Sequence, residues 1–588
     1  MKAIVVCLLI LLYFCRTTKP IQQLNKRLIV YTLFAFISSS VYTQELPIPV
    51  YPKGYFRYPL GIPIKLNANF GEMRPNHFHM GLDLFTQRKT NLPVYAPADG
   101  YIARIKIDPN GFGRALYINH PNGYTTLYAH MNTFTPEVEA YLVEQQYANE
   151  KWKIEVQVPA NKFKVQKGQF IGNSGNTGAS EGPHVHFEIR KTENDNCVNP
   201  LFFGFNIPDN IPPVLTRLAV YDRNKSTFEQ FPAIFVFKKT GDTFKLASPL
   251  IKTMASKVSF AITAFDRVNG FTNSLGFNQA LVYDNDKPVS GFLIDNIGYD
   301  MTRYLNAHID YRIKTNGGAY LQHLSALPGN RLDIYKKWNK NGLVDLSDGE
   351  IHHITLLVKD SYGNTSKAAF NIQQSGTPVE ASLPGELMKP NEVNVYENNE
   401  LQVYISEKGL YDAIHFIYGK EPSAIGLSDV YVLQNPSIPL QDSMIVGIKA
   451  TRKISGDDAN HVLMYHTGKK KPDVARAYFK DGWFTAKFRE FGTFQLVLDN
   501  EPPKITGNIF NGANLSKASF IKFIVSDNYK EIKNFRAELD GKWLLFGGTS
   551  NTFTYRMDSH CPPGEHELKV RVEDEAGNVT EQVYRFVR

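Results

Sequence analysis

The segment from residue 173 to residue 190 constrains the fold more than any other part of the sequence. From His184 onward it alternates, with His184, His186 and Glu188 at one parity and apolar residues between them. This period of two predicts a half-buried β-strand whose imidazoles project from one face, about 7 Å apart. Glycines at 172, 175, 178 and 182 predict a tight preceding loop that can pass close to something bound beside the histidines.

Two histidines on one strand are common, so a functional role requires partners elsewhere in the chain. About a hundred residues earlier, His79 and Asp83 share parity if residues 81–85 are extended, and His130 ends another alternating run. A catalytic zinc site uses three nitrogen or oxygen ligands and leaves one position for water, whereas structural zinc sites usually contain cysteine. No cysteine lies near these residues. The alternative to a catalytic metal site is therefore chance, not a structural zinc.

Further motifs surround these positions, in one order and at regular spacing. They are Asn69-Phe70-Gly71-Glu72-Met73-Arg74, His79-Met80-Gly81-Leu82-Asp83-Leu84, Pro93-Val94-Tyr95-Ala96-Pro97-Ala98-Asp99-Gly100, Leu127-Tyr128-Ala129-His130, Lys167-Gly168-Gln169, Ser174-Gly175-Asn176-Thr177-Gly178 and Gly182-Pro183-His184-Val185-His186-Phe187-Glu188. Over about residues 55–205 the sequence resembles the lysostaphin-type, or LytM-like, zinc metalloendopeptidases of bacterial cell walls. The resemblance implies that His79, Asp83 and His186 bind one zinc ion and that His130 and His184 are catalytic.

The chemistry implied by the resemblance depends on zinc, which lowers the pKa of a bound water toward about 7 and polarises the scissile carbonyl. One of His130 and His184 would take a proton from water and pass it to the leaving amine, while the other would stabilise the oxyanion. The sequence does not assign these two roles. His77 has the wrong spacing for a ligand of this family and is expected at the surface or lining a groove. Glu188 is expected either to support the neighbouring histidine or to be a solvated or salt-bridged carboxylate.

The first 44 residues differ from the rest of the chain. Apolar runs at residues 3–14 and 28–37 are each shorter than the roughly 20 residues needed to span a bilayer. The second run follows basic residues and ends in small ones, which is typical of a signal peptide, with a short uncleaved anchor as the alternative. Without this leader the net charge falls from +8 to +3, because it contains five of the 65 basic residues and no acidic residue. So small a charge does not indicate nucleic-acid binding. Cys197 and Cys561 also remain, either free or bridged.

The sequence predicts a mainly β chain, with an antiparallel β-sheet LytM-like peptidase domain containing one inserted helix, followed by immunoglobulin-like β-sandwich modules. Thr135 and Pro136 with acidic residues after them predict a helix start, and the helix is expected to run to about Asn149. Residues 152–158 then alternate as a strand. This insertion is expected either to border the substrate groove or to form a purely structural flap.

Two sequence echoes predict the modules after the peptidase domain. Asp209-Asn210-Ile211-Pro212-Pro213 is echoed by Asp499-Asn500-Glu501-Pro502-Pro503, and Asp360-Ser361-Tyr362-Gly363-Asn364 by Asp574-Glu575-Ala576-Gly577-Asn578. A strand that enters and leaves Asp-x-x-Gly-Asn predicts a hairpin and resembles the last hairpin of immunoglobulin-like and fibronectin-like modules of secreted bacterial proteins. The predicted divisions are a leader at 1–44, the peptidase domain at 45–205, an immunoglobulin-like β-sandwich at 206–375, a linker at 376–394, a β-rich module of unknown type at 395–499 and an immunoglobulin-like or fibronectin-like module at 500–588.

These features favour an exported zinc endopeptidase that cuts peptide cross-links or stem peptides of peptidoglycan in the periplasm or cell envelope. The alternatives are a catalytically silent wall-binding scaffold or amidase activator of the same fold, and a surface adhesion protein. All five functional positions are intact, which favours the enzyme. The C-terminal modules are expected to contact the wall or an envelope protein, and residues 44–59 are a candidate autoinhibitory segment. The sequence predicts neither the bond that is cut nor the oligomeric state.

Overall fold

The computed structural model of the protein describes residues 46–377, 382–529 and 532–588. The predicted leader, residues 1–44, lies outside the described residues. Within the described ranges, no helix is both long enough and apolar enough to cross a membrane. Contacts divide the chain into a segment that ends at Pro47 and a unit from Ile48 to Arg588.

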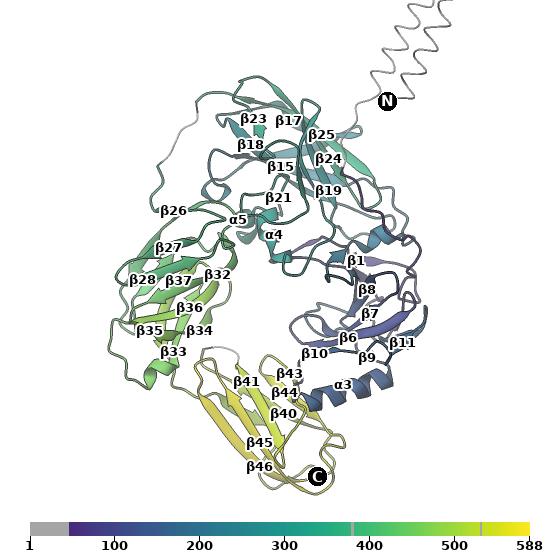
Figure 1. Cartoon of the computed structure of the whole chain (residues 1–588), viewed down its shortest axis with the longest axis vertical. Coiled ribbons are helices and arrows are strands. Elements are labelled where there is room, and N and C mark those ends of the chain that lie inside the picture. The colour runs from purple at the N-terminus through teal and green to yellow at the C-terminus, as the bar shows by residue number, and fades with distance from the viewer. Residues whose placement is uncertain (1–45, 378–381, 530–531) are drawn as a thin grey trace, which may run out of the picture. The chain divides into compact units, whose positions relative to one another are not determined.

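A nine-stranded antiparallel sheet in the described part of the peptidase domain carries all the predicted site strands (Figure 1). Its strands are, in spatial order, β1 (Leu66–Ala68), β4 (Leu82–Phe85), β13 (His184–Lys191), β8 (Tyr124–Ala129), β7 (Gly113–Asn119), β6 (Gly100–Asp108) and β10 (Ile154–Gln157), with β11 (Lys164–Val165) paired to β6 and β14 (Cys197–Val198) paired to β13. Two smaller sheets contain β5 (Pro93–Tyr95), β12 (Phe170–Asn173) and β9 (Thr133–Phe134), and β2 (Met73–Arg74) with β3 (His77–Phe78).

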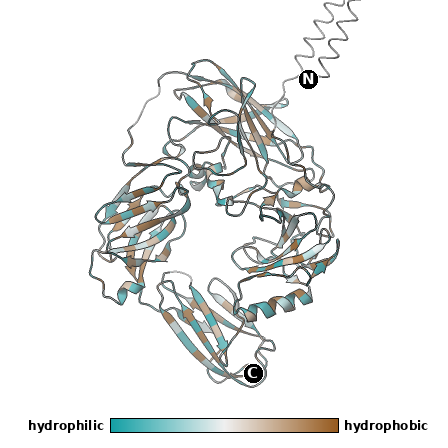
Figure 2. Ribbon diagram, viewed as in Figure 1, coloured by the Kyte–Doolittle hydropathy of each residue, from teal (hydrophilic) through white to brown (hydrophobic). Residues whose placement is uncertain are grey.

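The alternation of apolar and polar residues fixes which face of each strand enters the core. Figure 2 shows hydrophobic and hydrophilic residues interspersed along the strands. On β13, Val185, Phe187 and Ile189 are fully buried in the core of the peptidase domain. The polar face was predicted to be exposed, but His186 and Glu188 are buried as well. The strand is therefore covered on both faces, and the segment that covers the polar one is described below.

The inserted helix forms where the sequence predicts it. Helix α3 spans Pro136–Ala148, with Thr135 at the N-cap in an extended conformation and Asn149 at the C-cap. The Thr135 side chain makes no capping hydrogen bond, so the helix start depends on Pro136 and on the acidic first turn. Val138 and Leu142 are buried in the peptidase core, and β10 extends the edge of the main sheet beside β6. These contacts give the helix a structural role.

The residues after the peptidase domain are also built from strands. An eleven-stranded sheet follows, with β21 (Gln322–His323), β18 (Lys257–Phe265), β15 (Val214–Asp222), β16 (Ala233–Thr240), β17 (Thr243–Thr253), β25 (Thr365–Gln374), β24 (His352–Lys359), β19 (Gln279–Asp284), β20 (Lys287–Leu293), β22 (Tyr335–Lys337) and, on β18, β23 (Val344–Asp345). Two short helices, α4 (Leu305–His308) and α5 (Tyr311–Thr315), accompany it.

Two further groups of sheets complete the described chain. The first contains β27 (Asn394–Glu397), β28 (Leu401–Ile405), β32 (Pro439–Ile448), β36 (Trp483–Glu490) and β35 (Tyr478–Lys480), then β30 (Tyr418–Glu421), β31 (Val430–Leu433), β37 (Gly492–Leu498), β33 (Val462–Thr467) and β34 (Asp473–Arg476), and the pair β26 (Glu386–Met388) and β29 (Ile414–Phe416). The last contains β38 (Lys504–Gly507), β40 (Phe520–Ser526), β44 (Thr552–Arg556) and β43 (Gly547–Thr549), then β39 (Ala513–Asn514), β46 (Val579–Val587), β45 (Glu565–Glu573), β41 (Asn534–Leu539) and β42 (Lys542–Trp543).

The mainly β, antiparallel fold class is confirmed. The domain boundaries and the immunoglobulin-like character of the modules stay predictions. One segment differs from its prediction, because β26 lies inside residues 376–394, which were expected to be a linker. Its pairing with β29 supplies the hydrogen bonds that a free linker would lack.

The loop that precedes β4 packs against residues of the eleven-stranded sheet. Phe70, Phe78 and Met80 belong to the same buried cluster as Phe292 and Ile294. The backbone N–H of Phe78 also donates a 2.8 Å hydrogen bond to the hydroxyl of Thr302. The segment that leads to His79 is therefore held by side chains more than 200 residues away in the sequence.

Close packing between the chain before β4 and β13 makes a prediction about Gly81. A methyl group on Gly81 would lie 2.3 Å from the carbonyl oxygen of Phe187, whereas one on Gly182 would meet no heavy atom within 4 Å. We expect Gly81→Ala to destabilise the pairing of β4 with β13 by about 1–3 kcal/mol, the usual cost of overpacking. Hydrogen exchange in peptides covering β4 and β13 should accelerate in Gly81→Ala and stay unchanged in the control Gly182→Ala. Equal exchange in the two variants would contradict this account.

Candidate metal centre

Three neighbouring strands bring the predicted site residues together. β13 lies between β4 and β8, and its His186 pairs in register with Asp83 on β4 and with Ala129 on β8. His130 follows β8 directly and takes a left-handed backbone conformation, with φ of 60°. His79 was predicted to share an extended strand with Asp83, but it precedes β4 and reaches Asp83 from the loop.

The atoms of the three predicted ligands form a small triangle. His79 Nε2 lies 2.9 Å from Asp83 Oδ1 and 2.9 Å from His186 Nδ1, and His186 Nδ1 lies 3.0 Å from Asp83 Oδ1. Ligand atoms that bind one tetrahedral zinc at about 2.0–2.1 Å stand about 3.3 Å apart, so a small expansion would admit the ion.

The hydrogen bonds made by the outward-facing ring nitrogens of His79 and His186 indicate that the triangle suits a cation. His79 Nδ1 lies 2.7 Å from the carbonyl oxygen of Asn69, and His186 Nε2 lies 2.9 Å from Glu188 Oε1. Both partners are acceptors, so each ring donates its N–H outward. The inward nitrogen of each ring offers a lone pair toward the other ring and toward Asp83 once its own proton is lost, and either a proton or a metal cation lies between atoms this close. His79, Asp83 and His186 could thus hold a metal ion, as the sequence predicts for zinc.

Glu188 is buried and connects the metal centre to the next part of the chain. Its Oε1 accepts hydrogen bonds from His186 and from the hydroxyl of Tyr299, and its Oε2 accepts them from Arg190 Nε at 2.6 Å and Cys197 Sγ at 3.2 Å. Both sequence interpretations are observed in part, because Glu188 supports His186 and is also salt-bridged to Arg190. Tyr299 lies 111 residues from Glu188, and no local pattern in the sequence marks it. It covers the polar face of β13.

The two predicted catalytic histidines lie beside the triangle. His130 and His184 have ring centroids 4.7 Å apart, and His184 Nε2 lies 3.4 Å from Asp83 Oδ1. His130 Nδ1 donates to the carbonyl oxygen of Thr177 at 2.7 Å, and His184 Nδ1 donates to that of Gly182 at 2.8 Å. Both rings therefore keep Nε2 free of their backbone partners, and this nitrogen can accept or give a proton.

Burial and the neighbouring groups shift the pKa values of the site residues in different directions. Burial, with His186 and His184 nearby, lowers the pKa of His130 to about 3. Burial alone would lower the pKa of His186, but the hydrogen bonds to Asp83 and Glu188 raise it to about 9. Burial would raise the pKa of Asp83, yet His79 and the other histidines hold it well below its usual range. The acidic groups are thus anionic, which is the state that binds a cation.

Other residues that the sequence singled out lie away from the triangle. His77 is exposed, as expected, and its Nδ1 lies 2.9 Å from the carbonyl oxygen of Pro75. Tyr51, in the candidate autoinhibitory segment, packs against Phe203 and donates a 2.6 Å hydrogen bond to Asp295, so it contacts the core and not the ligands. Cys197 and Cys561 are both buried and free, which resolves the open question of a bridge.

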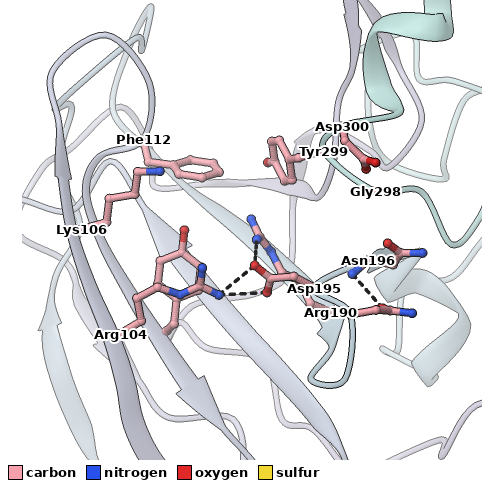
Figure 3. A pocket seen from close by; sticks show the side chains of 11 residues that line it. Arg104, Lys106, Phe112, Arg190, Asp195, Asn196, Gly298, Tyr299 and Asp300 are labelled. Atoms are coloured by element: carbon pink, nitrogen blue, oxygen red, sulfur yellow. Dashed lines mark hydrogen bonds and ion pairs between the residues drawn. The ribbon is translucent and has the colours of Figure 1, made fainter. Parts of the chain in front are cut away.

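A pocket of about 340 Å³ adjoins the metal centre (Figure 3). Arg104 and Lys106 of β6 line one part of it, and Phe112 and Tyr299 line another. The Phe112 ring lies 5.9 Å from the ring of His186 and 5.8 Å from that of Tyr299, so these aromatic rings separate the pocket from the ligands. Glu155 of β10 pairs with both basic residues. The strand of the predicted insertion therefore contacts two residues that line this pocket, while its helix packs in the core.

Family models match two parts of the chain. The model described as peptidase family M23 matches residues 77–147 and 143–200, which contain all five predicted site residues. The chain therefore contains a peptidase family M23 domain. A model described as a Zu5-like domain matches residues 385–499, which include the module predicted as β-rich and of unknown type. The predicted resemblance to the lysostaphin-type peptidases is confirmed.

Curated relatives match the same region of this chain. The chain is 32% identical over 158 residues to an "uncharacterized metalloprotease" of Haemophilus influenzae, and the match covers 25% of this chain and 27% of the relative. It is 33% identical over 162 residues to the DD-carboxypeptidase/endopeptidase Mpg of Neisseria meningitidis, covering 27% and 31%. Over 143 residues it is 30% identical to the peptidoglycan DD-endopeptidase ShyA of Vibrio cholerae, covering 23% and 27%. The chain thus spans less than a third of the length of each relative.

The geometry predicts how zinc content should respond to mutation. Alanine at His79, Asp83 or His186 removes one corner of the triangle, so we expect purified protein to lose near-stoichiometric zinc in each case. His77→Ala is the matched control, because this histidine lies two residues from His79 but is exposed and bonded elsewhere. Zinc is quantified by elemental analysis. Zinc loss from the control, or full zinc in Asp83→Ala, would contradict the assigned ligand set.

The buried Glu188 gives a second prediction for the same measurement. Glu188→Gln keeps the volume but weakens the acceptor that fixes the His186 ring, and changes of this kind usually cost about 10- to 100-fold in metal affinity. Glu155→Gln is the control, since this carboxylate has no contact with a ligand histidine. Competition with a zinc chelator measures the affinities. Equal affinity of the two variants would show that Glu188 does not support the metal centre.

Proposed function

We propose that this protein is a zinc-dependent endopeptidase that cuts peptide cross-links or stem peptides of peptidoglycan in the cell envelope. The observation that carries the proposal is the triangle of His79, Asp83 and His186 with two further histidines beside it. A site that only held a structural metal would need neither His130 nor His184. The names of the Neisseria and Vibrio relatives support the substrate class.

The chain's own residues supply positions for each part of the reaction. A zinc ion in the triangle would activate water and polarise the scissile carbonyl. His130 and His184 each present Nε2 and so can take the proton of the attacking water, pass it to the leaving amine, or donate a hydrogen bond to the oxyanion. Their outward hydrogen bonds to Thr177 and Gly182 fix the ring orientations before substrate binds.

The pocket beside the metal centre is a candidate for binding part of the substrate. Its lining combines the aromatic rings of Phe112 and Tyr299 with the basic side chains of Arg104 and Lys106. Stem peptides carry carboxylates, and a partly paired cationic lining suits such groups. Because Tyr299 follows the peptidase domain in the sequence, the residues after 205 contribute to this binding surface.

Activity and zinc content together test the proposal. We expect the zinc-loaded protein to release soluble muropeptides from purified peptidoglycan. Asp83→Ala should lose both zinc and activity, whereas His130→Ala and His184→Ala should retain zinc and lose at least about 100-fold in activity, because they remove proton transfer or oxyanion stabilisation but no ligand. Mass spectrometry of the products identifies the bond that is cut.

Two controls sharpen this experiment. His77→Ala should keep both zinc and activity, and adding zinc back to chelated protein should restore release. Full zinc without any cleavage in the unmodified protein would contradict the enzyme and favour a wall-binding scaffold or amidase activator. Cleavage that survives His130→Ala and His184→Ala together would contradict the proposed catalytic residues.

A further inference from the structure

Two clusters of three aspartates lie outside the M23 metal centre. Asp209, Asp266 and Asp360 each offer a carboxylate oxygen, and these oxygens lie within 4.8 Å of one another. Asp209 lies in the chain that leaves the peptidase domain, just before β15, whereas Asp266 directly follows β18 and Asp360 directly follows β24. We name these residues the first triad. It joins the segment after the peptidase domain to two strand ends of the following sheet.

The same arrangement occurs a second time. Asp499, Asp527 and Asp574, the second triad, also bring carboxylate oxygens within 4.8 Å of one another. Asp499 directly follows β37 and precedes β38, while Asp527 directly follows β40 and Asp574 directly follows β45. In both triads one aspartate comes from the segment before a Pro-Pro pair and another from an Asp-x-x-Gly-Asn loop. The echoes in the sequence thus correspond to a repeated cluster in space.

Among the residues that the structure describes, each triad contains a buried carboxylate oxygen without a hydrogen-bond partner. Asp266 is 2% exposed and its Oδ1 has no hydrogen-bond partner in the described part of the chain. Asp499 is 1% exposed, and its Oδ2 has no such partner there either. A buried carboxylate oxygen without a partner is strongly unfavourable, so such atoms are normally hydrogen-bonded, ion-paired or bound to a metal.

In the first triad, the charges of two aspartates disfavour ionisation of the third. Burial first, and then the charges of Asp360 and Asp209, raise the pKa of Asp266 to about 8. Asp360 is held in place by hydrogen bonds from the backbone N–H groups of Tyr362 and Asn364 and from the Asn364 side chain. Asp574 receives the equivalent bonds from Gly577 and Asn578. Asp360 and Asp574 are thus fixed in place beside the other two carboxyl groups of their triads.

The chemistry of the ligand atoms in the two triads indicates which cation they would bind. The triads offer carboxylate oxygens and no nitrogen or sulfur, which suits a hard cation and not zinc. Two oxygens bound to one calcium at about 2.4 Å can stand up to about 4.8 Å apart, and calcium accepts a variable set of further carbonyl and water ligands. Magnesium requires a tighter octahedron at about 2.0–2.1 Å and keeps most of its water.

We propose that each triad binds one calcium ion, which ties the chain before a Pro-Pro pair to the strand ends of the sheet that follows it. The first ion fixes the exit from the peptidase domain, and the second fixes the entry into the last group of sheets. Calcium therefore acts on the two junctions and not on the reaction. The proposal is independent of the endopeptidase activity, since neither triad shares a residue with the zinc ligands.

Calcium binding by the full chain tests the proposal. Zinc-loaded protein is freed of calcium and dialysed against calcium chloride, and bound calcium and zinc are quantified together. We expect two calcium ions per chain with affinities in the range of about 0.1–1 mM that is common for extracellular modules. Asp266→Asn and Asp499→Asn should each bind one calcium, and the double variant none, with zinc unchanged in all of them. Asp286→Asn, an exposed carboxylate outside both triads, is the matched control and should bind two.

A second measurement needs no variant and so does not depend on how a variant folds. Hydrogen exchange of residues 206–213 and 499–503 should slow at least about threefold when calcium is added, and should not slow with magnesium or sodium chloride at the same ionic strength. Less than one calcium per chain at about 5 mM, or equal protection by all three salts, would overturn the proposal. Retention of both ions by Asp266→Asn or by Asp499→Asn would overturn it for that triad. None of these results depends on whether peptidoglycan is cut.

Discussion

The pairing of β13 between β4 and β8 is the interaction on which the metal centre depends. Side chains on adjacent antiparallel strands stand about 5 Å apart when they are in register, so the register alone brings His186 beside Asp83 and within reach of His130. A shift of one residue would turn both histidines of β13 into the core. The apolar residues at the other parity prevent that shift, because it would expose Val185, Phe187 and Ile189 to the polar face.

A chain of hydrogen bonds extends this local arrangement into the rest of the molecule. His186 is oriented by Glu188, and Glu188 is held by Arg190, Cys197 and Tyr299. A buried carboxylate is stable only when its oxygens are satisfied, and here four donors satisfy them. The pKa of Glu188 is lowered because Arg190 and His186 outweigh the effect of burial. The metal centre and the residues after position 205 therefore form one electrostatic unit.

Sequence reasoning identified those parts of the site that depend on short-range patterns. The strand predicted from the alternation that begins at His184 agrees with β13, His184–Lys191, because alternation records which side chains face the core. Helix α3 begins at Pro136 as the first-turn residues indicate. The burial of Glu188 and the contribution of Tyr299 could not be predicted in this way, since they arise from a contact across 111 residues. His79 lies beside Asp83 as predicted, but it reaches Asp83 from a loop and not from the shared extended strand on which the prediction was based.

The shared core of Phe70, Phe78 and Met80 with Phe292 and Ile294 has a consequence for how such a protein can change over evolution. Peptidase domains that are joined to their neighbours by loose tethers can be recombined with other modules freely. In this protein, a recombination near residue 205 would leave large apolar side chains without a complementary surface, and it would also remove the tyrosine that contacts Glu188. The region that carries the family motifs and the residues directly after it therefore share one buried cluster, so a cut near residue 205 would not separate two independent cores.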